Sequence, residues 1–163
     1  MGSDSDLPIM KSAVEILEEF GISSDVCILS AHRTPIEMME YAKNASENNI
    51  EIIIAGAGGS AHLPGMIASL TLIPTIGVPI KSQNLSGIDS LLSIIQMPKG
   101  IPVATVAING GQNAGLLAAQ IIGISDNIVK NRLRAFRQEM HSEVRKKNKN
   151  LKIKGIKTYL EEN

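Results

Sequence analysis

The sequence predicts an α/β fold in which a parallel β-sheet lies between two layers of helices, a three-layer α/β/α sandwich. Short apolar runs alternate along the 163 residues with segments of helical pattern, and this alternation is typical of parallel sheets. The apolar runs are continuous instead of alternating with polar residues, as expected for strands that are buried on both faces. No internal repeat or low-complexity linker interrupts the pattern, so we predict a single domain over residues 1–163.

The individual elements follow from end signals and apolar runs. Pro8 and Pro35 suit the first turns of two helices, Thr34 is a plausible N-cap, and Gly21 can end the first helix. We predict helices over residues 8–20, 34–48, 66–70, 87–96, 113–122 and 127–148, and strands over 26–29, 50–55, 74–78 and 102–108. The predicted core covers residues 1–123, and a helical basic tail covers 124–163, helical or loose beyond residue 150.

Composition narrows the class of protein. The single cysteine, Cys27, excludes an internal disulfide and fits a reducing compartment. It lies in an apolar run, so we predict a buried core residue there. The first residues lack the pattern of a signal peptide, and no apolar stretch is long enough to cross a membrane. We therefore expect a cytoplasmic protein without a membrane partner.

The charge is unevenly spread although the net charge is zero. Residues 130–163 hold eleven Lys and Arg against four Asp and Glu, which raises the question of nucleic-acid binding. Only Phe136 and Tyr159 could stack on bases there, and no nucleic-acid-binding motif is present. We predict no nucleic-acid partner and interpret the tail as a solvated helix that faces the acidic body or a neighbouring subunit.

Polar and glycine-rich residues collect where the predicted strands end, in residues 30–33, 56–65, 79–87 and 109–113. Ligands of open parallel sheets bind beyond the carboxyl ends of the strands. His32 can transfer protons near neutral pH, and Arg33 beside it offers a fork of donors for phosphate or carboxylate. A purely structural role for His32 remains an equal alternative on the residues alone.

Two further segments could contact an anionic ligand. Ser3 and Ser5 precede the first helix, where hydroxyls and free amides suit phosphate, and Asp6 could accept hydrogen bonds from ribose. A simple capping sequence is the alternative. Glycines at 56–59 let the backbone approach a ligand, or merely turn the chain. His62 has no cysteine or second histidine at metal-ligand spacing, so we predict no metal site.

Five motifs taken together indicate a protein family more specifically than any one of them does. They are GSDSD at 2–6, SAHRTP at 30–35, AGAGGSAHLPGM at 55–66, GVP at 77–79 and DSLLSIIQMP at 89–98. In this order they resemble the successive signatures of the bacterial-type N5-carboxyaminoimidazole ribonucleotide mutases, collinearly from residue 1 to about residue 123. The resemblance implies a flavodoxin-like fold, a homo-octamer with sites near subunit interfaces, and no metal or organic cofactor.

The resemblance also implies that the protein acts in de novo purine (IMP) biosynthesis, and it implies a role for each site residue. His32 would be the general acid/base, Arg33 and the serines would hold phosphate, and Asp6 would bind ribose. The expected substrate-binding residues are Ser3, Ser5, Asp6, Ser30, Arg33, Ala57, Gly58, Gly59, His62 and Leu63. The loop at 56–59 and His62 would form the wall around the migrating carboxylate.

The expected reaction moves a carboxyl group from an exocyclic nitrogen to ring carbon C4 of one ribonucleotide, by decarboxylation and recarboxylation. Two alternatives remain open at this stage. An aminoimidazole ribonucleotide carboxylase would use free CO2, and a non-catalytic nucleotide-binding module would show no turnover.

This sequence departs from the mutase pattern in three places. Asp4 puts an acid close to the expected phosphate, and the loop at 109–113 is short. The family also has a β-strand immediately before the GSDSD motif. We therefore expect that residues 26–29 and 50–55 border an empty strand position, and that the natural protein carries several apolar residues before Met1.

Overall fold

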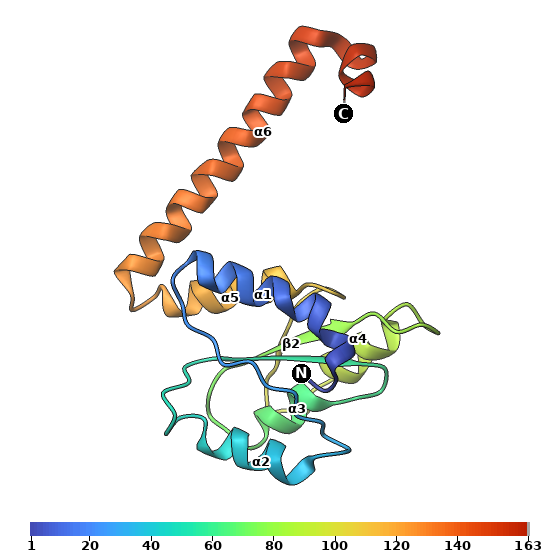
Figure 1. Ribbon diagram of the computed structural model, residues 1–163, viewed down its shortest axis with the longest axis vertical. Coiled ribbons are helices and arrows are strands. Elements are labelled where there is room, and N and C mark those ends of the chain that lie inside the picture. The colour runs from blue at the N-terminus through green and yellow to red at the C-terminus, as the bar shows by residue number, and fades with distance from the viewer. Residues whose placement is uncertain (163) are drawn as a thin grey trace.

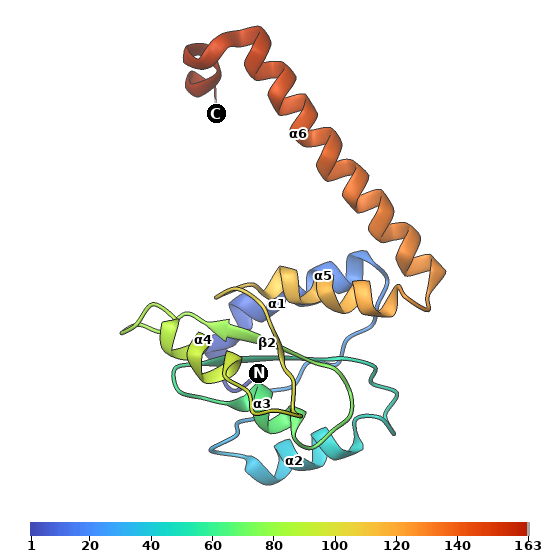
Figure 2. The same ribbon diagram turned by 180° about the vertical axis from the view of Figure 1, so that it is seen from behind.

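The computed structural model describes residues 1–162 and places helices on both faces of a parallel sheet, which confirms the predicted fold class (Figures 1 and 2). In chain order the elements are η1 (Asp4–Asp6), α1 (Leu7–Glu19), α2 (Pro35–Asn44), β1 (Ile53–Gly58), α3 (Leu63–Ala68), β2 (Thr75–Ile80), α4 (Ile88–Ile95), β3 (Ala104–Thr105), α5 (Gly111–Ile122) and α6 (Asn127–Glu161).

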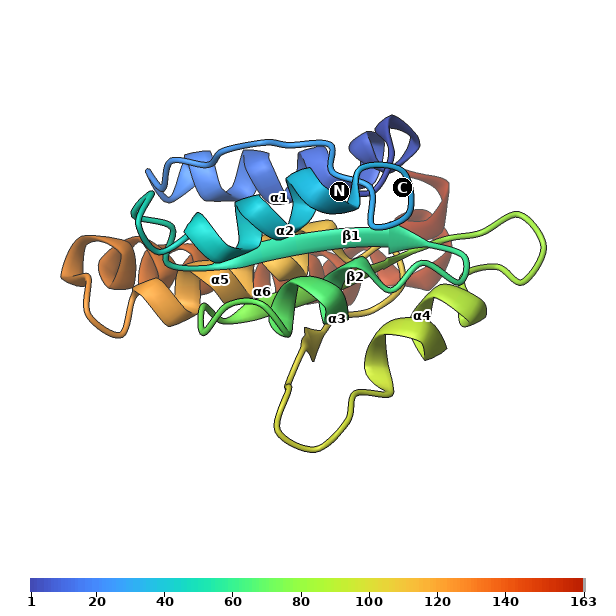
Figure 3. The same cartoon turned by 90° about the horizontal axis from the view of Figure 1, so that it is seen from below.

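The sheet has the order β1-β2-β3, with both pairs parallel. The register sets Ile53 opposite Thr75 and Gly58 opposite Ile80, so β1 and β2 end at the same level. Figure 3 shows the loops after both strands at one end of the sheet, on the side where the chain begins. The sheet therefore gathers the predicted ligand loops at one edge.

Helices α1 and α5 pack together on one face of the sheet, while α3 and α4 contact β1 and β2 from the other face, with α2 against α3. Small residues let α5 approach α1 closely, because a Cβ added at Gly115 would lie 2.2 Å from Cγ2 of Ile16.

Three predicted strands differ from the structure. Residues 26–29 form no strand, β1 begins three residues later than predicted, and the strand predicted at 102–108 is reduced to Ala104–Thr105. The first two differences share a physical cause. β1 starts where Ile53 meets its partner Thr75 on β2. Residues 50–52 and 26–27 border a groove instead, and within residues 1–162 no strand pairs with them.

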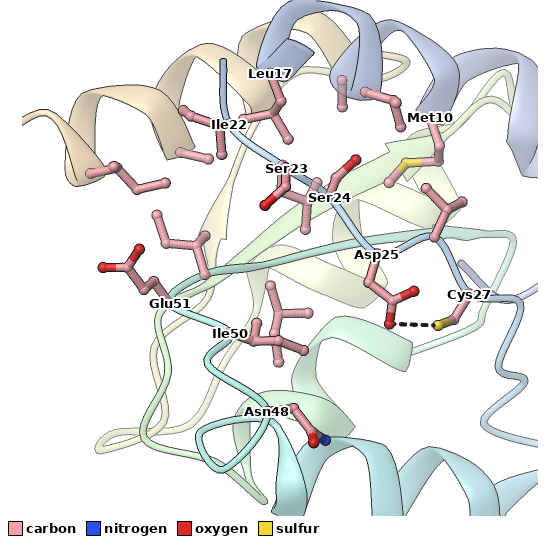
Figure 4. Close-up of a pocket in the computed structure, with 18 of the residues that line it drawn as sticks. Met10, Leu17, Ile22, Ser23, Ser24, Asp25, Cys27, Asn48, Ile50 and Glu51 are labelled. Atoms are coloured by element: carbon pink, nitrogen blue, oxygen red, sulfur yellow. Dashed lines mark hydrogen bonds between the residues drawn. The ribbon is translucent and has the colours of Figure 1, made fainter. Parts of the chain in front are cut away.

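Cys27 lies at this groove and not in the core. It is only half-buried, and its Sγ donates a hydrogen bond to Oδ2 of Asp25 over 3.4 Å. Burial and the neighbouring carboxylate raise the pKa of the thiol. The prediction of a core cysteine was wrong because residues 25–27 line a groove instead of packing in the core (Figure 4).

The carboxyl-terminal helix is present as predicted but longer. α6 extends away from the body to Glu161, with a break where Gly155 takes a φ of 74° (Figures 1 and 2). Its first turns are fixed to the body, because Nη1 of Arg132 donates to the Phe20 carbonyl over 2.5 Å and Phe136 packs edge-on against the Phe20 ring. Among residues 1–162, none of the helices combines the length and apolarity that a membrane crossing requires.

Candidate active site

A cavity of about 530 Å³ opens where β1 and β2 end and the chain begins. Ten of the eleven predicted site residues line it: Ser3, Ser5, Asp6, Ser30, His32, Arg33, Ala57, Gly58, Gly59 and Leu63. Gly2, Ala31, Ala61, Ile80, Lys81, Ser82 and Gln83 complete the lining. The residues from 2–6 and 30–33 form what we call the amino-terminal wall, and those from 57–59 and 80–83 form the glycine wall.

The amino-terminal wall begins with a tightly hydrogen-bonded turn. The backbone N–H of Ser3 donates to Oδ2 of Asp6 over 3.1 Å, and the N–H of Ser5 donates to Oγ of Ser3 and to Oδ1 of Asp4. This is a reciprocal capping arrangement. The predicted free amide at this helix start is therefore occupied, because the Asp4 carboxylate takes it. The Ser3 hydroxyl also donates to Oδ1 of Asp4, over 3.0 Å.

Asp6 is the one buried carboxylate of this wall, with 5% of its surface exposed. Burial raises the pKa of the Asp6 carboxyl, while the Ser3 N–H and the positive amino terminus act in the opposite direction. An acceptor held in this way, with one oxygen already bonded to the backbone, suits a neutral hydroxyl donor such as ribose.

Arg33 joins the two segments of the amino-terminal wall. Its Nε donates to Oγ of Ser30 over 3.3 Å, and its Nη2 donates to the Gly2 carbonyl over 3.0 Å. A guanidinium has five N–H donors, so three remain for a ligand. Thr34 holds the turn itself, since its hydroxyl accepts from the Ser30 N–H over 2.9 Å instead of capping α2.

His32 is exposed at the mouth of the cavity, directly before Arg33. Within residues 1–162 its ring makes no hydrogen bond, whereas the flanking Ala31 is buried and anchors the turn in the core. Both ring nitrogens of His32 are thus available to a bound molecule. A histidine on a fixed turn with an unoccupied ring can act as general acid and base toward that molecule.

The glycine wall is built from backbone and is held together by one buried hydroxyl. Ser90 on α4 is fully buried, accepts from the Gly59 N–H over 2.8 Å and donates to the Ile80 carbonyl over 2.6 Å. The ends of β1 and β2 are thereby fixed relative to each other. A Cβ added at Gly58 would meet Ile80 and Asp6 only at 3.6–4.0 Å, so the backbone here is open to a close ligand.

Sequence reasoning named the loop at 79–87 but none of its site residues. The backbone N–H of Lys81 donates to Oδ1 of Asn109 over 2.8 Å, and the Ser82 hydroxyl donates to Oδ1 of Asp89 over 2.6 Å. These bonds hold Lys81 at the cavity as a second cation besides Arg33. A usable signal was present, because Lys81 directly follows the apolar run of β2.

His62 does not line the cavity, although its neighbours Ala61 and Leu63 do. Its Nδ1 is bonded to the Ser93 carbonyl on α4. The ring packs over Gly65, where an added Cβ would lie 2.0 Å from Nε2. His62 therefore links α3 to α4. Residues 1–162 contain no group of three or more His, Cys, Asp or Glu placed to hold a metal ion.

Comparison with known proteins connects this geometry to a family. The family described as AIR carboxylase matches residues 1–143. The chain belongs to the AIR carboxylase family. The matched residues include both walls of the cavity.

Similar relatives span nearly the whole chain. It is 59% identical to the N5-carboxyaminoimidazole ribonucleotide mutase of Thermotoga maritima, covering 98% of this chain and 94% of that protein. It is 60% identical to the enzyme of the same name from Pyrococcus horikoshii, covering 99% and 92%. The crystal structure of Treponema denticola PurE is similar with a TM-score of 0.86 and 28% identity, covering 93% of this chain and 95% of that one.

Proposed function

We propose that this chain is an N5-carboxyaminoimidazole ribonucleotide mutase of purine biosynthesis. The observation that carries the proposal is the position of His32, whose unoccupied ring lies at the cavity beside Arg33. It is supported by the mutase relatives of similar length at 59% and 60% identity. A cytoplasmic location, which the single cysteine favours, belongs to the same proposal.

The substrate is placed across both walls. Arg33 presents three donors toward the phosphate, and the Ser3, Ser5 and Ser30 hydroxyls lie on the same wall. Asp6 accepts from the ribose hydroxyls. The aminoimidazole ring and its carboxylate then lie between His32 and the glycine wall, where the backbone at Gly58 leaves room for them.

The reaction has two proton transfers and one carbon transfer. The protonated His32 ring gives its proton to the exocyclic nitrogen as the N–C bond breaks and CO2 is released. Carbon C4 of the ring then attacks the carbon of CO2, which forms the new C–C bond. The neutral His32 ring removes the C4 proton and is ready for the next turnover. Atoms balance, and holding CO2 beside C4 replaces a bimolecular encounter.

A further part of the proposal is that the subunits assemble into a homo-octamer. Apolar side chains on α6 are exposed, including Val144 at 65% and Ile156 at 72%, and Leu92 on α4 is exposed at 54%. These apolar side chains are available for contacts between subunits, and the resemblance to the mutases supplies the expected number of subunits. Sedimentation of the purified chain should give a particle of about eight subunits, and a stable, active monomer at assay concentration would contradict it.

The deciding assay compares two substrates. The purified chain should convert N5-carboxyaminoimidazole ribonucleotide at low bicarbonate and show no faster turnover of aminoimidazole ribonucleotide when bicarbonate is added. Preference for aminoimidazole ribonucleotide with bicarbonate would assign the carboxylase reaction instead. Binding of either nucleotide without turnover would assign a non-catalytic binding module.

A further inference from the structure

Among the described residues that line the candidate active site, Lys81 is the one charged side chain that the reaction proposed above does not use. It follows β2 directly and lines the cavity beside Ile80 and Ser82. The residue is exposed, and within residues 1–162 no hydrogen bond or ion pair reaches its ammonium group. A lysine that lines a cavity with its three donors unpaired is available to an anionic ligand.

The backbone of Lys81 is held in place on two sides. On one side, its N–H donates to Oδ1 of Asn109 over 2.8 Å, and the Asn109 N–H donates to the Pro79 carbonyl over 2.8 Å. On the other side, the Cα of Lys81 lies close to Gly87, where an added Cβ would approach it to 3.1 Å. The origin of the side chain is therefore fixed at the cavity wall, while its four-carbon stem remains flexible.

Asn109 takes an unusual backbone conformation at this contact. Its φ is 58°, in the left-handed region that asparagine adopts more readily than most residues. β3 ends at Thr105, which lies opposite Gly77, so the strand stops short of Lys81. The Asn109 side chain bonds the backbone of Lys81 beyond that point. The turn at Asn109 thus supports the residue that carries the cation.

Two main-chain donors of the loop after β1 are already occupied. The Gly59 N–H is bonded to Oγ of Ser90 over 2.8 Å, and the Ala61 N–H is bonded to the Gly58 carbonyl over 3.3 Å. These N–H groups cannot also receive a carboxylate at full strength. A positive charge on the glycine wall comes from Lys81 instead.

The two cations of the cavity belong to different walls. Arg33 lies on the amino-terminal wall and Lys81 on the glycine wall. The proposed substrate likewise carries two anionic groups, a phosphate on the ribose and a carboxylate on the aminoimidazole. The planar fork of Arg33 suits the phosphate. Lys81 then lies on the wall against which the aminoimidazole carboxylate is placed.

We propose that the ammonium group of Lys81 binds the carboxylate of the substrate and of the product, and that it makes the site select carboxylated over uncarboxylated aminoimidazole ribonucleotide. This role rests on the function proposed above and names the residue that recognises the migrating group. The carboxylate is on the exocyclic nitrogen before the reaction and on C4 after it. Lysine suits both positions, because its compact charge moves on a flexible stem.

The proposal predicts a particular kinetic pattern. Between the two steps the carbon is held as CO2, which is neutral, so the ammonium interacts with substrate and product more strongly than with the intermediate. Removing an interaction that is made in the bound ground state raises KM more than it lowers kcat. Lys81→Gln should therefore raise KM for N5-carboxyaminoimidazole ribonucleotide about tenfold, with a smaller effect on kcat.

The deciding measurement is a calorimetric titration with two nucleotides that differ only in the carboxylate, 4-carboxy-5-aminoimidazole ribonucleotide and 5-aminoimidazole ribonucleotide. Lys81→Gln should weaken binding of the first about tenfold and of the second by less than about twofold. Lys81→Arg keeps the charge and should retain more of the affinity for the carboxylated nucleotide than Lys81→Gln. Lys99→Gln is the matched control, because Lys99 is exposed and lies outside the described lining of the cavity.

Two results of the titration would overturn the proposal. An equal loss for both nucleotides would mean that Lys81 acts on the phosphate or the ribose. Unchanged affinity for both would mean that Lys81 does not contact the nucleotide. The titration needs no turnover, so failure of the proposed function is distinguishable. A chain that converts neither nucleotide but loses affinity only for the carboxylated one in Lys81→Gln would be a binding module whose carboxylate is held by Lys81.

Discussion

The two walls of the candidate active site are built in different ways. The amino-terminal wall presents side chains that ionise or donate, and its segments are held by hydrogen bonds such as that from Arg33 to Gly2. The glycine wall presents mainly backbone and is held from behind by the buried Ser90. Apart from Lys81, the ionisable side chains therefore lie on one side of the cavity, and mainly backbone lies on the other.

This difference has a consequence for substitutions. Changes at the exposed His32 and Arg33 of the amino-terminal wall should remove rate or affinity and leave the fold intact. Changes behind the glycine wall should reduce stability together with activity, because Ser90 has no contact with solvent. The following predictions test this division.

The largest effect is expected at His32. The variant His32→Asn should fold and bind nucleotide but lose about 100- to 10,000-fold in turnover, the usual contribution of general acid-base catalysis. Steady-state kinetics and a melting curve measure both properties. His141→Asn is the matched control, since His141 is exposed on α6 away from the cavity. Near-wild-type turnover of His32→Asn would contradict the assignment of His32 as the general acid/base.

The next effect is expected at Arg33. Arg33→Lys should weaken binding of the ribonucleotide about tenfold, because lysine cannot form a bidentate contact with phosphate. Calorimetry should compare the ribonucleotide with the ribonucleoside that lacks phosphate. An equal loss for both ligands would show that Arg33 is no phosphate ligand and acts only through its bonds to Ser30 and Gly2.

A smaller effect, on stability, is expected behind the glycine wall. Ser90→Ala leaves the Gly59 N–H and the Ile80 carbonyl without their partner, which costs about 1–3 kcal/mol for a buried group. Urea unfolding measures the loss. The control is Ser93→Ala on the same helix, whose hydroxyl bonds only the Asp89 carbonyl one turn earlier. Equal stability of the two variants would refute the tethering role of Ser90.

The smallest effect concerns pH. Burial raises the pKa of the Asp6 carboxyl in the folded chain above its usual 3.8, so the folded state binds this proton more tightly than the unfolded state. The stabilisation from that proton is present below pH 3.8 and disappears as the pH rises through the folded pKa. The melting temperature of wild type relative to Asp6→Asn should therefore fall across this range. A difference that rises with pH would contradict the shift.

The sequence predicted the fold class and most of the site because both depend on local signals. Continuous apolar runs identified β1 and β2, and the polar residues after them identified the ligand edge. The residues that it missed depend on contacts between distant segments. Nothing near Ser90 in the sequence indicates that its hydroxyl joins Gly59 to Ile80.

Two differences from the sequence predictions have the same origin. The resemblance implied that His62 belongs to the wall around the carboxylate, but its ring bonds the Ser93 carbonyl on α4 and does not line the cavity. Residues 26–29 have the composition of a strand. Among the described residues, however, only Met1 forms backbone hydrogen bonds with them. Strand formation requires the partner as well as the pattern.

The central claim is that the carboxyl group moves within one site between the two walls. The most direct measurement supplies N5-carboxyaminoimidazole ribonucleotide labelled with ¹³C in the carboxylate, in unlabelled bicarbonate, and follows a single turnover by NMR. The account predicts that the product carries ¹³C in its new carboxylate without dilution. A product whose carboxylate carries the unlabelled carbon of the solution would show that CO2 enters from outside and would contradict the account.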